Sequence, residues 1–310
     1  MVSAQRRNTS GRSEVRLTAA QARQLALKAQ GLWHEPQWTL PELSQRLGAI
    51  QLDTISVLAR NHELIPYARL GAVSRNEIER HYWSRKPVRH FEYWSHAACI
   101  IPVEKWPLYA FRRDNARATE PTWHNVPKKT IASVLKRVEV DGPITTGDVG
   151  GGKKSGYWWD WSDNKIALEY LLNTGDVTVI QREGFRRIYD LSSRAIPAKH
   201  FKDMERIPAQ VALLNEAINM LGVATKLDLL DVPRLKPTHS KDSWDAFVAQ
   251  KHVLPIEVEG WDQPAYTTQE WLNQLDSSKA MRTVMLSPFD PLIWYRERME
   301  RLFGMFHRIE

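Results

Sequence analysis

The sequence has 310 residues and a formal net charge of +7, from 43 lysines and arginines against 36 aspartates and glutamates. Hydrophobic residues make up 43% and charged residues 25% of the chain, which is typical of a globular protein and excludes a disordered or fibrous one. A single cysteine, Cys99, excludes an internal disulfide framework and a cysteine-based zinc site. We expect a cytoplasmic protein without membrane association, because no apolar run approaches the roughly 20 residues that span a bilayer and no secretory signal is visible.

The positive charge is concentrated in the first half of the chain. Residues 1–142 hold 22 lysines and arginines against 13 aspartates and glutamates, whereas residues 209–310 hold 11 against 14. A basic region joined to an acidic one favours a protein that grips a polyanion such as DNA or RNA. Solubility alone would also explain the charge.

Two capping boxes predict the first helices. Thr18 with Gln21 marks one helix start, and Thr39 with Glu42 marks another, which is expected to end at Gly48. The segment AIQLDTISVL, which follows Gly48, alternates only partly between apolar and polar residues. It is therefore predicted as a strand or as an extended crossing segment.

The middle of the chain predicts a winged-helix order, that is, helices followed by a hairpin. An apolar stripe from Ile131 to Val138 predicts one helix, and Ser162 is placed to cap another that ends at Gly175. The segments VTVI and FRRIYDL, joined by a turn at Glu183-Gly184, predict a β-hairpin. A third helical unit follows from about residue 209, with VLPIEVE and PAYTT as its hairpin. We predict four parts: a basic flexible tail at 1–16, an N-terminal helical or winged-helix domain at 17–129, a second winged-helix domain at 130–207 and a third at 208–310.

Two local patterns resemble known ligand sites without matching them. The glycine-rich segment 147–154 nearly spells a phosphate-binding loop, but Lys154 stands where that loop needs a metal-binding hydroxyl. A flexible basic loop at a nucleic-acid surface is the better interpretation. His90, Glu92 and His96 lack the H-E-x-x-H spacing and a third ligand, so we predict no metal site and instead partly buried histidines among aromatic residues.

The triplet Gln51-Leu52-Asp53 is the remaining candidate for chemistry. In an extended segment Gln51 and Asp53 lie on the same side, with Leu52 on the other. A carboxylate beside an amide can hold and activate one water molecule. A solvated or turn-capping aspartate would give the same pattern.

Four separated blocks of the sequence resemble the YcaQ/AlkZ family of bacterial DNA glycosylases. They are LGAIQLDTISVLARNHELIPYARLG (47–71), FEYWSHAACIIPVEKWP (91–107), WWDWSDNKIALEYLLNTGDVTVIQREGFRRIYDL (158–191) and SPFDPLIWYRERMERLFGMFHRIE (287–310). The resemblance implies a mainly α fold with small β-hairpins (α+β), built of tandem winged-helix domains around a basic channel. Because the family chain continues beyond RIE, the third domain is expected to be incomplete at its C-terminus.

The resemblance also implies a reaction. The family motif is glutamine, an aliphatic residue, then glutamine or aspartate, and Gln51-Leu52-Asp53 resembles the YcaQ-like branch. Gln51 and Asp53 are thus the expected catalytic residues of a monofunctional glycosylase without lyase activity, metal or other cofactor. It would hydrolyse the N-glycosidic bond of N-alkylated (N7) purines and unhook interstrand crosslinks. The expected partner is double-stranded DNA that carries such purines, bound by a monomer that associates with the nucleoid.

DNA contacts are predicted for basic residues in two places. The candidates are Arg60, His62 and Arg69 near the motif, and Lys153, Lys154, Arg186 and Arg187 in the second domain. A non-catalytic winged-helix DNA-binding protein or regulator would explain the helices and the charge equally well, but would not require Gln51 and Asp53. A structural protein or inactive paralogue is the third possibility.

Overall fold

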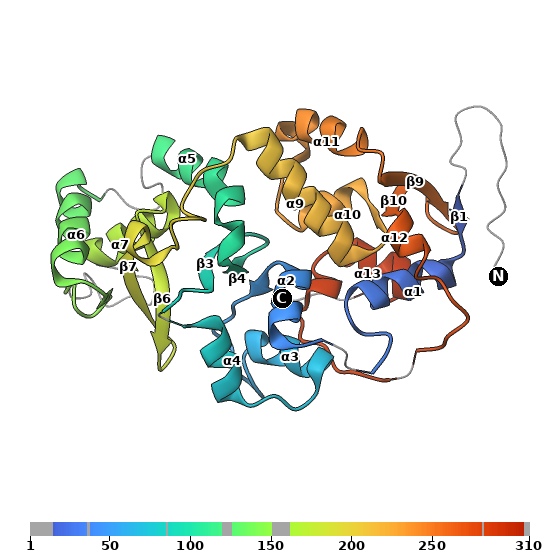
Figure 1. The fold of residues 1–310 in the computed structure, drawn as a ribbon, viewed down its shortest axis with the longest axis horizontal. Helices are drawn as coiled ribbons and strands as arrows, with labels where there is room; N and C mark the ends of the chain where they lie inside the picture. The colour runs from blue at the N-terminus through green and yellow to red at the C-terminus, as the bar shows by residue number, and fades with distance from the viewer. Residues whose placement is uncertain are drawn as a thin grey trace. The chain divides into compact units, whose positions relative to one another are not determined.

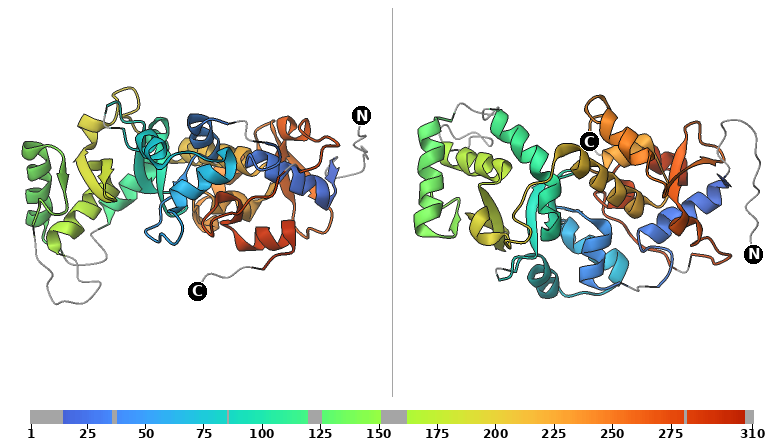
Figure 2. Two further views of the ribbon diagram at one scale, coloured as in Figure 1. Left: turned by 90° about the horizontal axis from the view of Figure 1, so that it is seen from below. Right: turned by 45° about the horizontal axis from the view of Figure 1, so that its top comes forward.

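The computed structural model describes residues 15–35, 38–84, 86–119, 126–150, 162–280 and 282–306. The described chain folds into two compact units, and Figures 1 and 2 show each of them as a mixture of helices and short strands. The first unit comprises the described residues within Met1–Ile78, Ser95–Cys99 and Gln210–Glu310, and the second unit comprises those within Glu79–Trp94 and Ile100–Ala209. None of the described helices is long and apolar enough to cross a membrane.

The first unit takes its elements from both ends of the chain. They are β1 (Arg16–Leu17), α1 (Ala19–Ala29), α2 (Leu40–Leu47), β2 (Ile50–Gln51), α3 (Asn61–Leu70), the start of α4 (Arg75–Tyr82), the start of β4 (Ala98–Pro102), most of α9 (Arg206–Leu221), β8 (Ala224–Thr225), α10 (Lys226–Asp231), η2 (Pro237–His239), α11 (Lys241–Val248), β9 (Val253–Val258), β10 (Ala265–Thr268), α12 (Gln269–Leu272), η3 (Pro291–Ile293) and α13 (Arg296–Phe303). The side chains of Thr18 and Thr39 cap α1 and α2 in complete capping boxes, which confirms both predicted helix starts.

One sheet joins the two ends of the chain within the first unit. Its strand order is β1-β9-β10-β8, and the predicted β9–β10 hairpin is confirmed. Strand β1 runs parallel to β9, with Leu17 opposite Val258. The apolar face of α1, including Leu25, packs with Leu17, Ile256 and Leu302 in one buried cluster. The core of this unit is thus completed only when the C-terminal third of the chain folds onto α1.

Gly222 marks a close approach between two helices of the first unit. Its backbone has φ +72°, and a Cβ atom there would lie 2.7 Å from the carbonyl oxygen of Leu25 on α1. Both the positive φ and the missing space require glycine. The carbonyl of Gly222 also accepts a 2.6 Å hydrogen bond from the Thr267 hydroxyl, so the end of α9 is tied to β10.

The second unit contains the predicted hairpin. Its elements are the end of α4, β3 (His90–Trp94), the remainder of β4, η1 (Val103–Tyr109), α5 (Ala110–Ala118), α6 (Lys128–Asp141), β5 (Ile144–Thr145), α7 (Asp163–Thr174), β6 (Val177–Glu183), β7 (Arg186–Leu191), α8 (Ser192–Ala195) and the start of α9. Strands β6 and β7 pair antiparallel, with Glu183 opposite Arg186. The two residues between them, Gly184 and Phe185, both have positive φ, as a tight hairpin turn requires.

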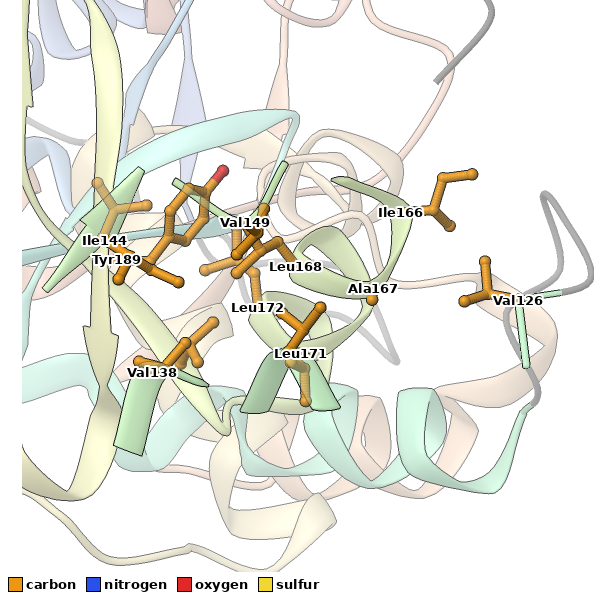
Figure 3. Packing of buried hydrophobic residues seen from close by; sticks show 13 residues of the cluster. Val126, Val138, Ile144, Val149, Ile166, Ala167, Leu168, Leu171, Leu172 and Tyr189 are labelled. Carbon is orange, nitrogen blue, oxygen red and sulfur yellow. The ribbon is translucent and has the colours of Figure 1, made fainter. Parts of the chain in front are cut away.

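The core of the second unit forms between α6, α7 and the sheet β5-β7-β6. Figure 3 shows Leu171 and Leu172 of α7 beside Val138 of α6, with Tyr189 of β7 in the same buried cluster. The Ser162 hydroxyl accepts from the Lys165 N–H at the start of α7, which confirms the predicted cap. The mainly helical α+β class is therefore confirmed, while tandem winged-helix domains, their boundaries and the basic channel stay predictions.

Candidate active site

The Gln51-Leu52-Asp53 triplet lies at the end of the short strand β2. Only Ile50 and Gln51 have strand conformation, so most of the segment predicted as a strand or crossing is a loop. The Leu52 N–H donates a 2.7 Å hydrogen bond to the carbonyl of Ala98, which holds the triplet beside the start of β4. Gln51 and Leu52 are each 9% exposed, whereas Asp53 is half-buried. Its Oδ1 accepts a 2.6 Å hydrogen bond from the Ile55 N–H, so Asp53 does cap a turn.

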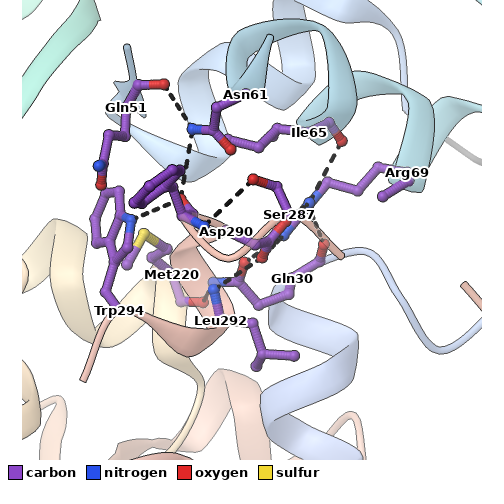
Figure 4. Close-up of polar contacts among 12 residues, drawn as sticks. Gln30, Gln51, Asn61, Ile65, Arg69, Met220, Ser287, Asp290, Leu292 and Trp294 are labelled. Atoms are coloured by element: carbon purple, nitrogen blue, oxygen red, sulfur yellow. Dashed lines mark hydrogen bonds and ion pairs between the residues drawn. The ribbon is translucent and has the colours of Figure 1, made fainter. Parts of the chain in front are cut away.

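A side chain from the first turn of α3 holds the backbone of Gln51. The buried Asn61 amide donates a 2.6 Å hydrogen bond to the Gln51 carbonyl and lies 3.5 Å from the carbonyl oxygen of Phe289. Figure 4 shows Asn61 reaching from α3 to the end of β2. The position of Gln51 thus depends on α3 and on the segment that precedes η3.

The same Phe289 carbonyl connects the triplet to two aromatic rings. It accepts a 2.9 Å hydrogen bond from the Trp294 indole N–H. The Trp294 ring stacks on the His96 imidazole, with 4.2 Å between the ring centroids and 4° between the planes. His96 is two residues from Ala98, whose carbonyl accepts the Leu52 N–H. The stacked rings are therefore connected to the triplet through Phe289 on the Trp294 side and through Ala98 on the His96 side.

His96 sits between groups that favour its neutral form. Burial, and next the charge of Arg234, lower the pKa of His96 to about 4. Its Nε2 lies 3.1 Å from Nη2 of Arg234, and its Nδ1 lies 3.2 Å from the backbone oxygen of Asp231. Because Arg234 only donates, Nε2 must accept, and the proton therefore belongs on Nδ1.

Asp231 and Arg234 form the charged part of this cluster. Burial raises the pKa of Asp231 to about 6, although Arg234 pairs with its carboxylate and opposes that change. Arg234 also donates a 3.0 Å hydrogen bond from Nε to the His96 carbonyl. Its backbone has φ +48°, which is uncommon outside glycine and costs conformational energy. Asp231, Arg234 and His96 thus form one connected cluster, and His96 stands two residues before Ala98, whose carbonyl accepts the Leu52 N–H.

Two of the three DNA-binding candidates near the triplet are buried. Arg60 precedes α3 and is partly exposed, whereas His62 is 1% exposed. The Arg69 side chain is fully buried and forms an ion pair with Asp290, with 2.7 Å between Nη1 and Oδ2. Arg69 also donates to the backbone and side-chain oxygens of Gln30, as Figure 4 shows. This burial corrects the sequence-based interpretation of Arg69, because a guanidinium so enclosed does not face a DNA phosphate.

The candidates in the second unit also differ from one another. Arg186 is exposed at the hairpin turn. Arg187 forms ion pairs with Glu92 and Glu169, both at 2.9 Å. Burial acts against its charge, but these two carboxylates outweigh burial and raise the pKa of Arg187. Lys153 and Lys154 lie outside the described residues.

The sequence interpretation missed Asn61, Asp231, Arg234 and Trp294, although two signals pointed to some of them. Asn61 falls in the first family-like block, and Trp294 falls in the last. His90 is buried and His96 is half-buried, and each contacts aromatic rings, as predicted. Among the described residues there is no group of histidines, cysteines and carboxylates that could hold a metal ion.

Comparisons with known proteins identify a family and a similar fold. A family model described as DNA glycosylase AlkZ-like matches residues 45–310. The structure of Streptomyces sahachiroi DNA glycosylase AlkZ is similar, with a TM-score of 0.63, 17% sequence identity, and coverage of 89% of this chain and 77% of that one. The match includes the triplet, Asn61, His96 and the Phe289–Trp294 segment.

Proposed function

Because the chain belongs to the AlkZ-like DNA glycosylase family, we propose that it excises N7-alkylated purines and unhooks purine interstrand crosslinks, with Asp53 and Gln51 as its catalytic residues. The chain is a DNA glycosylase, an enzyme of DNA repair, and its partner is DNA. The placement of the two residues supports their assignment as the catalytic pair. A buried network fixes Gln51, and Asp53 stands two residues further on, half-buried at the start of a loop.

The chemistry of the substrate explains why one carboxylate suffices. Alkylation at N7 makes the purine cationic, so the base leaves without protonation by a general acid. The sugar then carries positive charge, which the Asp53 carboxylate would stabilise electrostatically. The same carboxylate would accept a proton from the attacking water, as in glycoside hydrolysis.

Gln51 would position that water through its side-chain amide. The Asn61 side chain donates a 2.6 Å hydrogen bond to the Gln51 carbonyl, so the backbone that carries the Gln51 side chain is fixed. No lysine stands in the triplet to form a Schiff base with the sugar. The proposed product is therefore an intact abasic site, without strand cleavage.

The test is base release from a duplex that carries one N7-methylguanine or one nitrogen-mustard crosslink, read as strand cleavage after alkali. We expect release by the wild-type protein, and loss of release with retained binding in Asp53→Asn. The matched control is Asp245→Asn, an exposed aspartate on α11 of the same unit. Unchanged release by Asp53→Asn would overturn the catalytic assignment, and binding without release by the wild type would favour a non-catalytic DNA-binding protein.

A further inference from the structure

Three aliphatic side chains project into water directly after the catalytic triplet. Ile55 is 61% exposed, Val57 is 88% exposed and Leu58 is 82% exposed. We call Thr54–Leu58 the apolar loop. It contains no charged residue, and its two small polar residues, Thr54 and Ser56, are also exposed. Single exposed aliphatic residues are ordinary, but three in four positions mark a binding surface.

Hydrogen bonds hold the backbone at both ends of the apolar loop. At its start the Ile55 N–H is bound to the Asp53 carboxylate at 2.6 Å. After its end the Arg60 N–H donates a 2.8 Å hydrogen bond to Glu63, which fixes the start of α3. The bond from Asn61 to the Gln51 carbonyl then joins the two ends across ten residues. The loop base is thus held while its aliphatic side chains are left in water.

The position of the apolar loop indicates which surface it contacts. Asp53, which we propose to act on the sugar of the damaged nucleotide, is followed directly by the loop. Five extended residues reach at most about 17 Å, so the aliphatic tip must lie within a few base pairs of the lesion whenever Asp53 reaches that sugar. The apolar surface that DNA offers there is the stack of base faces. Proteins that insert apolar wedges between base steps use side chains such as leucine and isoleucine.

We propose that the apolar loop inserts Val57 and Leu58 into the base stack beside the damaged purine and unstacks it. This inference rests on the proposed function, because it takes the damaged nucleotide as the point that Asp53 contacts. It assigns a separate role to the loop: Asp53 and Gln51 act on the glycosidic bond, and Val57 and Leu58 hold the neighbouring bases apart. Insertion would also bury the exposed aliphatic surface, which favours binding.

The test measures unstacking without chemistry. A duplex carries 2-aminopurine next to a tetrahydrofuran abasic-site analogue, and the protein carries Asp53→Asn so that no reaction contributes. We expect a several-fold rise in 2-aminopurine fluorescence on binding. The rise should be lost when Val57→Ser and Leu58→Ser are added. Val140→Ser is the matched control, because Val140 on α6 is another exposed valine, at 69%, and it should keep the full rise.

A second readout separates the loop from the catalytic pair. With native Asp53, the Val57→Ser and Leu58→Ser double variant should release N7-methylguanine about tenfold more slowly from duplex DNA, and at the wild-type rate from single-stranded DNA, which has no duplex stack to open. An equal loss on both substrates, or an undiminished fluorescence rise, would overturn the proposal.

A full rise with lost binding to phosphatidylglycerol vesicles, or with a lost dimer in sedimentation, would instead assign the loop to a membrane or to a second copy of the chain. If Asp53→Asn alone still releases the base, the proposed function fails, while the fluorescence result still reports on the loop.

Discussion

The side-chain amide of Asn61 donates a 2.6 Å hydrogen bond to the backbone carbonyl of Gln51 in the interior of the first unit. This bond connects the first turn of α3 to the end of β2 and closes the segment between them. Both groups are buried, so neither can exchange its partner for water. The hydrogen bond thereby fixes the backbone of Gln51, one of the two proposed catalytic residues, and leaves the Gln51 side chain available for the reaction.

Replacing Asn61 should therefore affect both stability and chemistry. In Asn61→Ala the Gln51 carbonyl loses its partner, and we expect the free energy of unfolding to fall by about 1–3 kcal/mol. Base release should slow by roughly tenfold or more, because small displacements of a positioning group are costly. Urea unfolding and single-turnover release measure the two effects. Asn273→Ala, which removes an exposed asparagine on the surface, is the control, and wild-type release by Asn61→Ala would contradict the positioning role.

The buried pair of Arg69 and Asp290 should matter for folding rather than for DNA binding. Both side chains are fully buried, and removal of one partner leaves an uncompensated charge. We expect Arg69→Met to lower the free energy of unfolding by about 3–5 kcal/mol. The salt dependence of DNA binding should not change in protein that remains folded. A stable Arg69→Met protein with a reduced salt slope would restore the phosphate contact that the sequence predicted.

Arg186 and Arg187 are neighbours in sequence but should respond differently to substitution. If the exposed Arg186 contacts one phosphate, Arg186→Ala should reduce the slope of log K against log salt concentration by about 0.9. Arg187→Ala removes ion pairs with Glu92 and Glu169, so it should destabilise the second unit. Fluorescence anisotropy at several salt concentrations and urea unfolding separate the two outcomes. An equal effect of both variants on the slope would contradict this division.

Local features of the fold were predictable from the sequence, whereas long-range partners were not. The caps Thr18, Thr39 and Ser162 depend on residues three positions away, so the sequence pattern contains the whole interaction. Arg69 meets Asp290 across 221 positions, and no local pattern distinguishes a buried arginine from one that binds phosphate.

The candidate site likewise combines a local motif, which could be predicted, with long-range contacts, which could not. The triplet was recognisable as a motif because its three residues are adjacent. Its supporting groups come from α3 and from a segment more than 200 residues further along the chain, as the contact between Asn61 and Phe289 shows. The exposure of Val57 and Leu58 was equally unpredictable, because aliphatic residues near a strand pattern normally indicate a core.

Two buried histidines of the second unit should make its stability depend on pH. His81 and His90 face each other with 4.8 Å between their ring centroids. Burial, and next Arg89, lower the pKa of His81 to about 4, while burial, and next His81, lower the pKa of His90 to about 3. In the unfolded chain both have a pKa near 6.5.

The sign of the effect follows from proton counting. As pH falls below about 6.5, the unfolded chain binds protons that the folded unit does not accept until pH 4 or below. The contribution of neutral His81 and His90 to stability is thus complete above pH 6.5 and is lost progressively as the pH falls towards 4 and then 3. We expect the free energy of unfolding of the second unit to drop on the order of 3 kcal/mol between pH 7 and pH 5.

Urea unfolding at pH 7 and pH 5, followed by tryptophan fluorescence, tests this dependence. His90→Phe keeps an aromatic ring against Tyr82, which meets His90 edge-on at 5.4 Å, but it removes one titrating group. The drop between the two pH values should therefore be about halved in His90→Phe. His239→Phe, at an exposed position on η2, should leave the drop unchanged. Equal stability of the wild-type protein at both pH values would show that the two histidines accept protons without opening the fold.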